Sequence, residues 1–220
     1  MAKNGESIWY SWLVPGHIKH GGYNMNLELF NEMMKKGSGP ALRKFEWMIF
    51  LEFCDRHLKE HKIKNPVAVE LGIYKGRQRK FYERLFGADY IGVDILDRYV
   101  VPEIRGNTHD QKTLNALKKR LNGRAIDILF IDANHSYDSV KKDYEMYSPL
   151  CTGVIGFHDI ESGRYANQTI DGVYRFWDEL KNTRYPDTAT NEKYIFSSIH
   201  YAHFDDKIRR TLGIGIMVKR

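Results

Sequence analysis

VAVELGIYKGRQ, residues 67–78, passes from the pattern of a strand to that of a helix. Its apolar start behind Pro66 is typical of a buried parallel strand. The strand ends in an acidic residue, Glu70, and two glycines separated by three residues follow it, Gly72 and Gly76. Apolar residues then recur at helical spacing and predict a helix from about residue 78: Phe81, Leu85 and Phe86. Such a unit lets a ligand contact the backbone at the carboxyl edge of an α/β sheet.

A second acidic residue ends the next predicted strand. Residues 89–95 read DYIGVDI and place Asp94 at the strand end. About 20 residues after the first motif is the usual place for a carboxylate that accepts hydrogen bonds from the ribose hydroxyls of an adenosine. The turn is not the G-x-G-x-x-G of nicotinamide dehydrogenases, because Tyr74 stands in the place of the middle glycine. Taken alone, the two glycines fit an ordinary strand–helix turn equally well.

Together the two motifs resemble those of the class I S-adenosylmethionine-dependent methyltransferases. The run ELGIYKG, from Glu70 to Gly76, is similar to the first motif of catechol O-methyltransferase and its relatives. Further along, the chain looks most like the cephalosporin-hydroxylase-like and sugar O-methyltransferase branch, and the resemblance covers roughly residues 65–180. The resemblance implies an α/β fold: a doubly wound, mostly parallel, seven-stranded Rossmann-like sheet with a closing antiparallel hairpin. It also implies S-adenosylmethionine as cofactor, bound through residues that include Glu70, Gly72, Tyr74, Gly76, Arg77, Asp94 and Asp132.

The chain departs from the family at the end of the first motif. A serine that helps to hold the carboxylate of the cofactor is expected there, and Arg77-Gln78 stands instead. The guanidinium of Arg77 can pair with that carboxylate directly. The alternative is a weak affinity for the cofactor.

A polar run, Thr108-His109-Asp110, precedes a helix predicted over residues 111–120. In the family that the chain resembles, the matching run contacts adenine, and all three side chains can form hydrogen bonds with a purine edge. Thr108 and Asp110 are equally suited to cap the helix. The sequence leaves both interpretations open.

Two further predicted strands, residues 126–131 and 153–157, end in polar residues. The first leads into Asp132 and the second into His158-Asp159. Because neighbouring parallel strands lie about 4.8 Å apart, side chains at their ends can bind one cation. The resemblance implies a divalent metal, Mg²⁺ or Mn²⁺, at these three residues. His158 replaces the usual oxygen ligand, which shifts preference from Mg²⁺ toward Mn²⁺, Fe²⁺ or Zn²⁺, or leaves pairing with loop backbone as the role of His158 and Asp159.

His135 follows Asp132 by three residues. Catechol-type enzymes have a lysine general base at the matching position, and related sugar O-methyltransferases have a histidine. The attacking hydroxyl must lose a proton during methyl transfer, and an imidazole with an ordinary pKa near 6.5 can accept it at neutral pH. The resemblance therefore implies that His135 is the catalytic base, although an isolated histidine is more often structural.

The first part of the chain lies outside the resemblance. Residues 1–39 are rich in aromatics and glycine, and we expect them to form a cap, either a lid over the site or a contact through which the chain forms homo-oligomers. Pro40 predicts the start of a long amphipathic helix over residues 41–62. Residues 40–220 form the predicted S-adenosylmethionine-binding domain, which closes with strands over residues 193–204 and 212–219.

Composition sets further limits. The chain has 220 residues and a net charge of +6, with its basic residues scattered rather than clustered. No apolar run reaches the roughly 20 residues that span a bilayer, and the N-terminus lacks a signal-peptide pattern, so we expect a cytoplasmic protein without a membrane partner. Cys54 and Cys151 lie in apolar runs and are predicted to be buried thiols.

Three functions are compatible with these features. The first is an S-adenosylmethionine-dependent O-methyltransferase acting on a hydroxyl of a small molecule or saccharide. The second is a nucleic-acid methyltransferase, which is disfavoured because the run after the fourth strand, DANH, lacks the Asn/Asp-Pro-Pro-aromatic motif of enzymes that methylate base amines. The third is a cofactor-binding module without catalysis, which the departures at Arg77 and His158 keep open.

Overall fold

The computed structural model describes residues 25–35, 39–40, 42, 44–161, 172–184, 194–199 and 213–219. Within these ranges helices and strands largely alternate. The helices are α1 (Leu27–Met33), α2 (Lys44–Glu60), α3 (Arg79–Phe86), α4 (Gln111–Leu121), α5 (Tyr137–Tyr147) and α6 (Val173–Arg184). The strands are β1 (Val67–Leu71), β2 (Asp89–Asp94), β3 (Ile104–Arg105), β4 (Ile126–Ile131), β5 (Cys151–His158), β6 (Tyr194–Ile199) and β7 (Ile214–Lys219).

The described strands form one seven-stranded sheet in the order β3-β2-β1-β4-β5-β7-β6. The first five strands of this order run parallel to one another, whereas β7 is antiparallel to both β5 and β6. The predicted doubly wound sheet with a closing antiparallel hairpin is confirmed. The strand order reverses between β1 and β4, which is where open α/β sheets bind their ligands.

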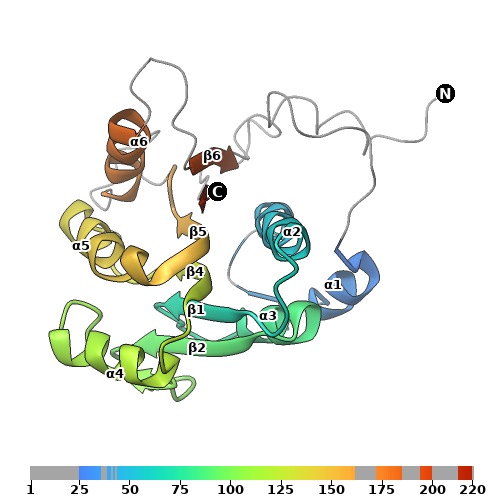
Figure 1. Ribbon diagram of the computed structural model, residues 1–220, viewed down its shortest axis with the longest axis horizontal. Helices are drawn as coiled ribbons and strands as arrows, with labels where there is room; N and C mark the ends of the chain where they lie inside the picture. The colour runs from blue at the N-terminus through green and yellow to red at the C-terminus, as the bar shows by residue number, and fades with distance from the viewer. Residues whose placement is uncertain are drawn as a thin grey trace.

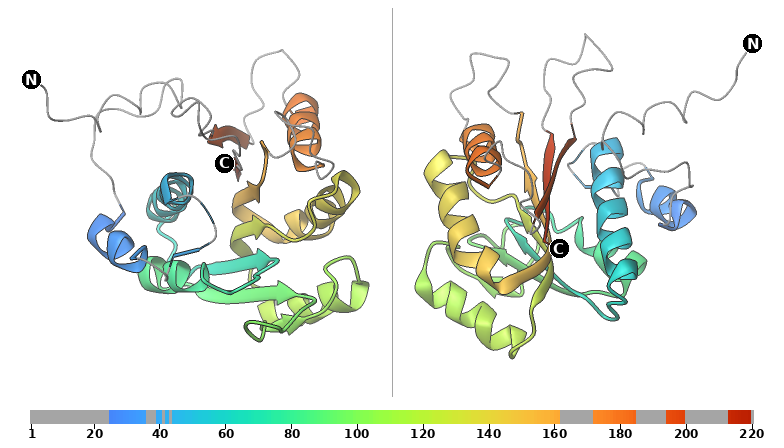
Figure 2. Two further views of the ribbon diagram at one scale, coloured as in Figure 1. Left: turned by 180° about the vertical axis from the view of Figure 1, so that it is seen from behind. Right: turned by 45° about the horizontal axis from the view of Figure 1, so that its top comes forward.

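Helices cover both faces of the sheet (Figures 1 and 2). On one face, α1, α2 and α3 pack over a core centred on Trp47, whose ring lies 5.4–5.8 Å from those of Phe50, Phe81 and Phe130. On the other face, α4, α5 and α6 cover a second apolar cluster. Because both faces are covered, β1 and β4 are almost entirely buried, as their continuous apolar runs predict.

Register brings the ends of the parallel strands to a common edge. Leu71 of β1 pairs with Val93 of β2 and with Ile131 of β4, and Ile131 pairs with Phe157 of β5. The residue that follows each of these four therefore lies at the same edge of the sheet: Gly72, Asp94, Asp132 and His158.

Strand β3 is very short, so it covers only the end of β2. In the middle of β2, which β3 does not reach, the side chain of Glu103 bonds to the backbone in place of a strand. Its Oε2 accepts a hydrogen bond of 2.7 Å from the backbone N–H of Gly92, in the middle of β2. The same carboxylate pairs with Arg79 at 2.7 Å.

Some predicted boundaries were wrong. Helix α2 begins at Lys44 rather than directly behind Pro40. For α5 the sequence predicts a helix from Ser139 to Tyr147, whereas the helix begins at Tyr137 because the hydroxyl of Ser136 accepts a hydrogen bond from the N–H of Ser139 and caps it.

Part of the predicted N-terminal cap is described. Helix α1 packs on α3 through Phe30 and Phe81, whose rings lie 5.7 Å apart, and Lys80 donates a 2.7 Å hydrogen bond to the carbonyl of Met33. The aromatic residues before position 25 lie outside the described residues. Both cysteines are buried free thiols, as predicted. In the described part of the chain, no helix combines the length and apolar character needed to cross a membrane.

Candidate active site

Four polar side chains meet at the ends of β4 and β5: Asp132, His135, His158 and Asp159, here called the β4–β5 cluster. Nδ1 of His158 lies 2.9 Å from Oδ1 of Asp132 and 3.5 Å from Oδ1 of Asp159. The imidazole of His135 spans both carboxylates. Its Nε2 lies 3.4 Å from Oδ1 of Asp132, and its Nδ1 lies 2.8 Å from Oδ2 of Asp159. His158 and Asp159 thus pair with side chains of the cluster.

The carboxylates strongly favour the charged form of His135. Hydrogen bonds to Asp132 and Asp159 raise the pKa of the His135 imidazole to about 10, against the opposing effect of burial. Burial alone would raise the pKa of Asp132, but the charge of His158 and hydrogen bonds from both histidines lower it to about 2. With no cation on the carboxylates, His135 is therefore an imidazolium at neutral pH and cannot accept a proton.

Three members of the β4–β5 cluster have the donors and spacing of a metal site. One ligand atom each from Asp132, His158 and Asp159 lies within 4.8 Å of the others. Nε2 of His158 and Oδ1 of Asp159 are buried and, among the described residues, have no hydrogen-bond partner. Unsatisfied polar atoms in such a place fit coordination to a cation, because leaving them unpaired is costly. Two carboxylates and one imidazole suit Mn²⁺, Fe²⁺ or Zn²⁺ better than an all-oxygen set would.

Asp159 has an unusual backbone conformation for the last member of this cluster. Its φ is +62°, in the left-handed region that residues other than glycine seldom adopt. The residue directly follows β5, and the conformation turns the chain as its carboxylate meets His135. Such conformations cost free energy and concentrate at functional sites.

The glycine turn after β1 is fitted to the β4 loop. Gly72 has a φ of +83°, and a Cβ there would lie 2.3 Å from the carbonyl oxygen of Asp132. Gly76 also has a positive φ, +62°, and its missing Cβ would meet Val100 at 2.9 Å. The first glycine is thus required by close packing between the two loops that border the site.

Asp94 holds the same turn in place. Its Oδ2 accepts hydrogen bonds from the backbone N–H groups of Ile73, at 2.9 Å, and Tyr74, at 3.2 Å, and its Oδ1 accepts one from Leu96. Since a carboxylate has about four acceptor positions, Asp94 retains capacity for a ribose hydroxyl. Its position at the strand edge is the predicted one, but the sequence did not indicate these contacts to the turn.

Glu70 is placed differently from the other predicted cofactor residues. It is fully buried, and its Oε2 accepts a 2.6 Å hydrogen bond from the hydroxyl of Tyr90. Burial raises the pKa of the Glu70 carboxyl well above its ordinary value, although the bond from Tyr90 lowers it. Glu70 therefore lies beneath the edge, in the apolar layer under α2 and α3, and a direct contact with a ligand would require rearrangement.

Arg77 and Tyr74 flank the turn. The guanidinium of Arg77 donates a 3.2 Å hydrogen bond to the carbonyl of Gly39, which ties the end of the N-terminal segment to the turn. Tyr74, with a φ of +47°, is 55% exposed. Both side chains lie at the predicted edge of the sheet.

The Thr108–Asp110 run is fixed by α5, which the sequence did not indicate. Tyr147 donates a 2.8 Å hydrogen bond to the carbonyl of Thr108, and Nε2 of His109 lies 3.3 Å from Oδ1 of the buried Asp143. Burial raises the pKa of Asp143, partly offset by Thr108 and His109. Asp110 occupies the N-cap position of α4 without a capping hydrogen bond from its side chain. An acidic residue on the buried face of a predicted helix was the available signal for Asp143.

Comparison with known proteins agrees with this geometry. Residues 69–160 match a family model described as a methyltransferase domain, and this range begins within β1 and contains β2 to β5 and the whole β4–β5 cluster. No curated protein matches the chain.

Two solved structures share the fold. MycE, a methyltransferase of the mycinamycin biosynthetic pathway solved with Mg, S-adenosylhomocysteine and mycinamycin VI, is 16% identical with a TM-score of 0.56, over 90% of this chain and 54% of that one. The O-methyltransferase TomG of Streptomyces achromogenes, involved in tomaymycin synthesis and solved with S-adenosylmethionine, is 14% identical with a TM-score of 0.57, over 81% of each chain. The chain thus spans about half the length of MycE. Residues 69–160 thus have the pattern of a methyltransferase domain, and the chain shares the fold of these two structures.

Proposed function

We propose that this protein transfers a methyl group from S-adenosylmethionine to a hydroxyl group of a small molecule or saccharide, with assistance from a divalent metal. The observation that carries the proposal is the β4–β5 cluster, in which two carboxylates and two imidazoles meet beside the glycine turn of a methyltransferase fold. Sulfonium methyl transfer to oxygen needs a place for the hydroxyl and an acceptor for its proton. The cluster offers both.

In this proposal Asp132, His158 and Asp159 hold the metal. A bound divalent cation supplies Lewis acidity, which lowers the pKa of a hydroxyl that it contacts. The three ligand atoms are close enough for one ion, and the orphaned Nε2 of His158 and Oδ1 of Asp159 gain a partner. The left-handed backbone of Asp159 fixes the direction of its carboxylate.

His135 is the proposed catalytic base. It lies at the open end of the cluster, one-third exposed, on the loop that leaves β4. Two anionic carboxylates hold it protonated, so the imidazole becomes a proton acceptor when their charge is neutralised. In this proposal, metal binding to the two carboxylates therefore determines whether His135 can act as the base.

The remaining edge of the sheet is assigned to the cofactor. The turn from Gly72 to Gly76 and the carboxylate of Asp94 border its proposed position, and the Thr108–Asp110 run lies at the end of β3. Arg77, directly after the turn, can meet the carboxylate of the cofactor if it leaves Gly39. The free thiols at Cys54 and Cys151 fit the cytoplasm as the place of action.

The decisive experiment separates binding from turnover. Calorimetry measures the affinity for S-adenosylmethionine with and without Mn²⁺. Transfer of a labelled methyl group is then followed over a panel of phenols, sugars, glycosides and short RNAs. We expect cofactor binding, a hydroxyl acceptor, and loss of transfer in chelator. Binding without transfer to any acceptor would indicate a silent binding module, and transfer to RNA would indicate the nucleic-acid alternative.

A further inference from the structure

Five large apolar side chains are exposed together beside the end of β2. They lie in the loop that follows this strand and in the glycine turn next to it: Tyr74, Ile95, Leu96, Tyr99 and Val101, here called the β2-loop patch. Each of these residues is between 51% and 74% exposed. The rings of Tyr74 and Tyr99 pack edge to face with their centroids 5.1 Å apart, which makes the two segments one surface. Contiguous exposed apolar groups of this kind mark an interaction surface.

Two cations lie on this patch. Nζ of Lys75 is 5.2 Å from the centroid of the Tyr74 ring and 5.4 Å from that of Tyr99, and the guanidinium of Arg98 is 5.3 Å from the Tyr99 ring. Of the nearby acids, Asp97 pairs with Arg105 at 2.7 Å and Glu103 pairs with Arg79, whereas Asp94 accepts hydrogen bonds from the backbone of Tyr74 and Leu96. Among the described residues, no ion pair neutralises Lys75 or Arg98. The patch is therefore apolar and positively charged.

The position of the β2-loop patch separates it from the proposed acceptor. Strand β1 lies between β2 and β4, whereas the β4–β5 cluster lies on the far side of β1. A hydroxyl bound at that cluster does not reach the end of the loop after β2. Tyr74 and Ile95 adjoin the turn and the Asp94 carboxylate that border the proposed cofactor, whereas Leu96, Tyr99 and Val101 lie further along the chain and have no assigned part in methyl transfer.

The chemistry of the patch identifies the partner. Stacking of nucleic-acid bases is disfavoured, because Lys75 and Arg98 already lie against the tyrosine rings. Three of the five apolar side chains are aliphatic, Ile95, Leu96 and Val101, and the long side chains of lysine and arginine can extend beside them to lipid phosphates. We propose that the β2-loop patch binds the surface of an anionic lipid bilayer, with the aliphatic side chains among the acyl chains and the two cations at the head groups.

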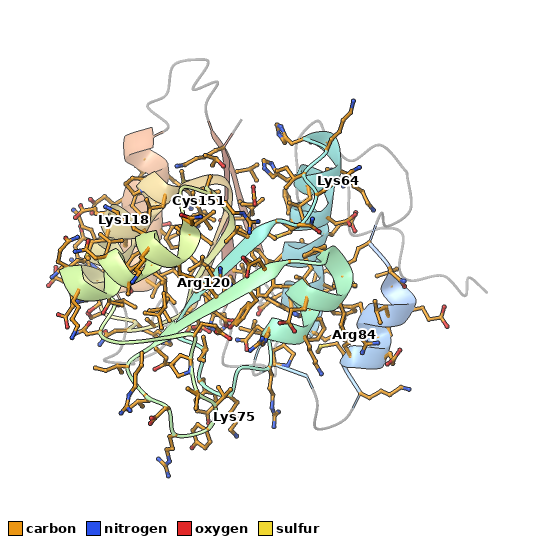
Figure 3. The ribbon with its side chains drawn as sticks, turned by 60° about the horizontal axis from the view of Figure 1, so that its bottom comes forward. Lys64, Lys75, Arg84, Lys118, Arg120 and Cys151 are labelled. Carbon is orange, nitrogen blue, oxygen red and sulfur yellow. The ribbon has the colours of Figure 1, made fainter. Side chains whose placement is uncertain are left out.

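This contact differs from a membrane span. The expectation of no membrane partner was based on the lack of a long apolar run, which does not bear on a loop at the bilayer surface. The interaction also does not depend on the proposed reaction, since it needs neither cofactor nor acceptor. Figure 3 shows Lys75 well apart from Lys64, Lys118 and Arg120, so the patch can be tested against other basic residues.

The test is sedimentation of the full chain with vesicles of phosphatidylcholine, alone or with about a quarter phosphatidylglycerol. We expect binding about tenfold stronger to the anionic vesicles. Leu96→Asp removes an exposed aliphatic contact and adds a negative charge, and we expect it to weaken binding about tenfold. Ala125→Asp is its matched control, because Ala125 is exposed at the start of β4, on the opposite edge of the sheet, and the charge change is the same.

The electrostatic part has its own pair of variants. Arg98→Glu should weaken binding to anionic vesicles severalfold, whereas Lys118→Glu, at the C-terminal end of α4, should not. Sedimentation no greater than in vesicle-free samples would overturn the proposal, as would an equal loss in Leu96→Asp and Ala125→Asp. A dimer that Leu96→Asp dissociates, without vesicle binding, would assign the patch to a second copy of the chain instead. Melting temperatures within the error of the wild type confirm that the variants are folded.

Discussion

Nδ1 of His135 lies 2.8 Å from Oδ2 of Asp159, although the two residues belong to loops that leave different strands. The contact closes the β4–β5 cluster, because the other nitrogen of the same ring faces Asp132 at 3.4 Å. It makes the protonation of His135 depend on whatever else the two carboxylates bind. Four predictions follow from the cluster and its neighbouring turn.

The first prediction concerns stability and pH in the presence of chelator. The pKa of His135 is about 10 in the folded protein and ordinarily 6.5, so its pairing stabilises the fold fully below pH 6.5 and is lost as the pH rises toward 10. Allowing for its one-third exposure, the loss should be roughly 1–2 kcal/mol. Urea unfolding between pH 6 and 10 measures it. His135→Gln should lack this decline, and a wild type with pH-independent stability would contradict the assignment.

The second prediction concerns catalysis by His135. His135→Ala should retain affinity for S-adenosylmethionine and lower the rate of methyl transfer about 10²–10⁴-fold, the usual range for one positioned proton acceptor. The wild-type rate at saturating metal should rise with pH through one ionisation that the variant lacks. Calorimetry and a pH–rate profile test the two parts separately. A variant with an unchanged profile would make His135 a structural residue.

The third prediction concerns metal preference. His158→Asp replaces the imidazole by a carboxylate and gives the site three oxygen donors. We expect the ratio of Mn²⁺ to Mg²⁺ affinity, measured by calorimetry, to fall about tenfold in this variant. Asp132→Asn should weaken both metals. If His158→Asp left the ratio unchanged, His158 would not be a ligand.

The fourth prediction separates two costs of replacing a turn glycine. Gly72 and Gly87 both have positive φ, +83° and +62°, but only at Gly72 would a Cβ collide with backbone, at 2.3 Å from the Asp132 carbonyl. Gly87→Ala should therefore destabilise by about 1 kcal/mol, for backbone strain alone. Gly72→Ala should cost several times more, or shift the β4 loop. Equal unfolding free energies would show that the loops adjust without cost.

The sequence predicts most of the sheet, because its strands are apolar runs with sharp polar ends. The proximity of Asp132 and His158 could be predicted from the sequence, since parallel strands end at one edge. The position of His135 between two carboxylates could not, because it depends on the left-handed backbone at Asp159 and on the cap at Ser136. The burial of Glu70 could not be predicted either, because an acid near a strand end has the same sequence pattern whether its side chain faces the edge or the core.

The carboxylate of Glu103 has a consequence for how the molecule behaves in concentrated solution. Because β3 is so short, β2 would otherwise present unpaired backbone groups at the border of the sheet, and such groups recruit strands from other chains. The carboxylate of Glu103 accepts the hydrogen bond of the Gly92 N–H and places a charged side chain beside β2. It thereby disfavours pairing of β2 with a strand of another molecule, so the border of the sheet is protected by one residue rather than by a longer strand.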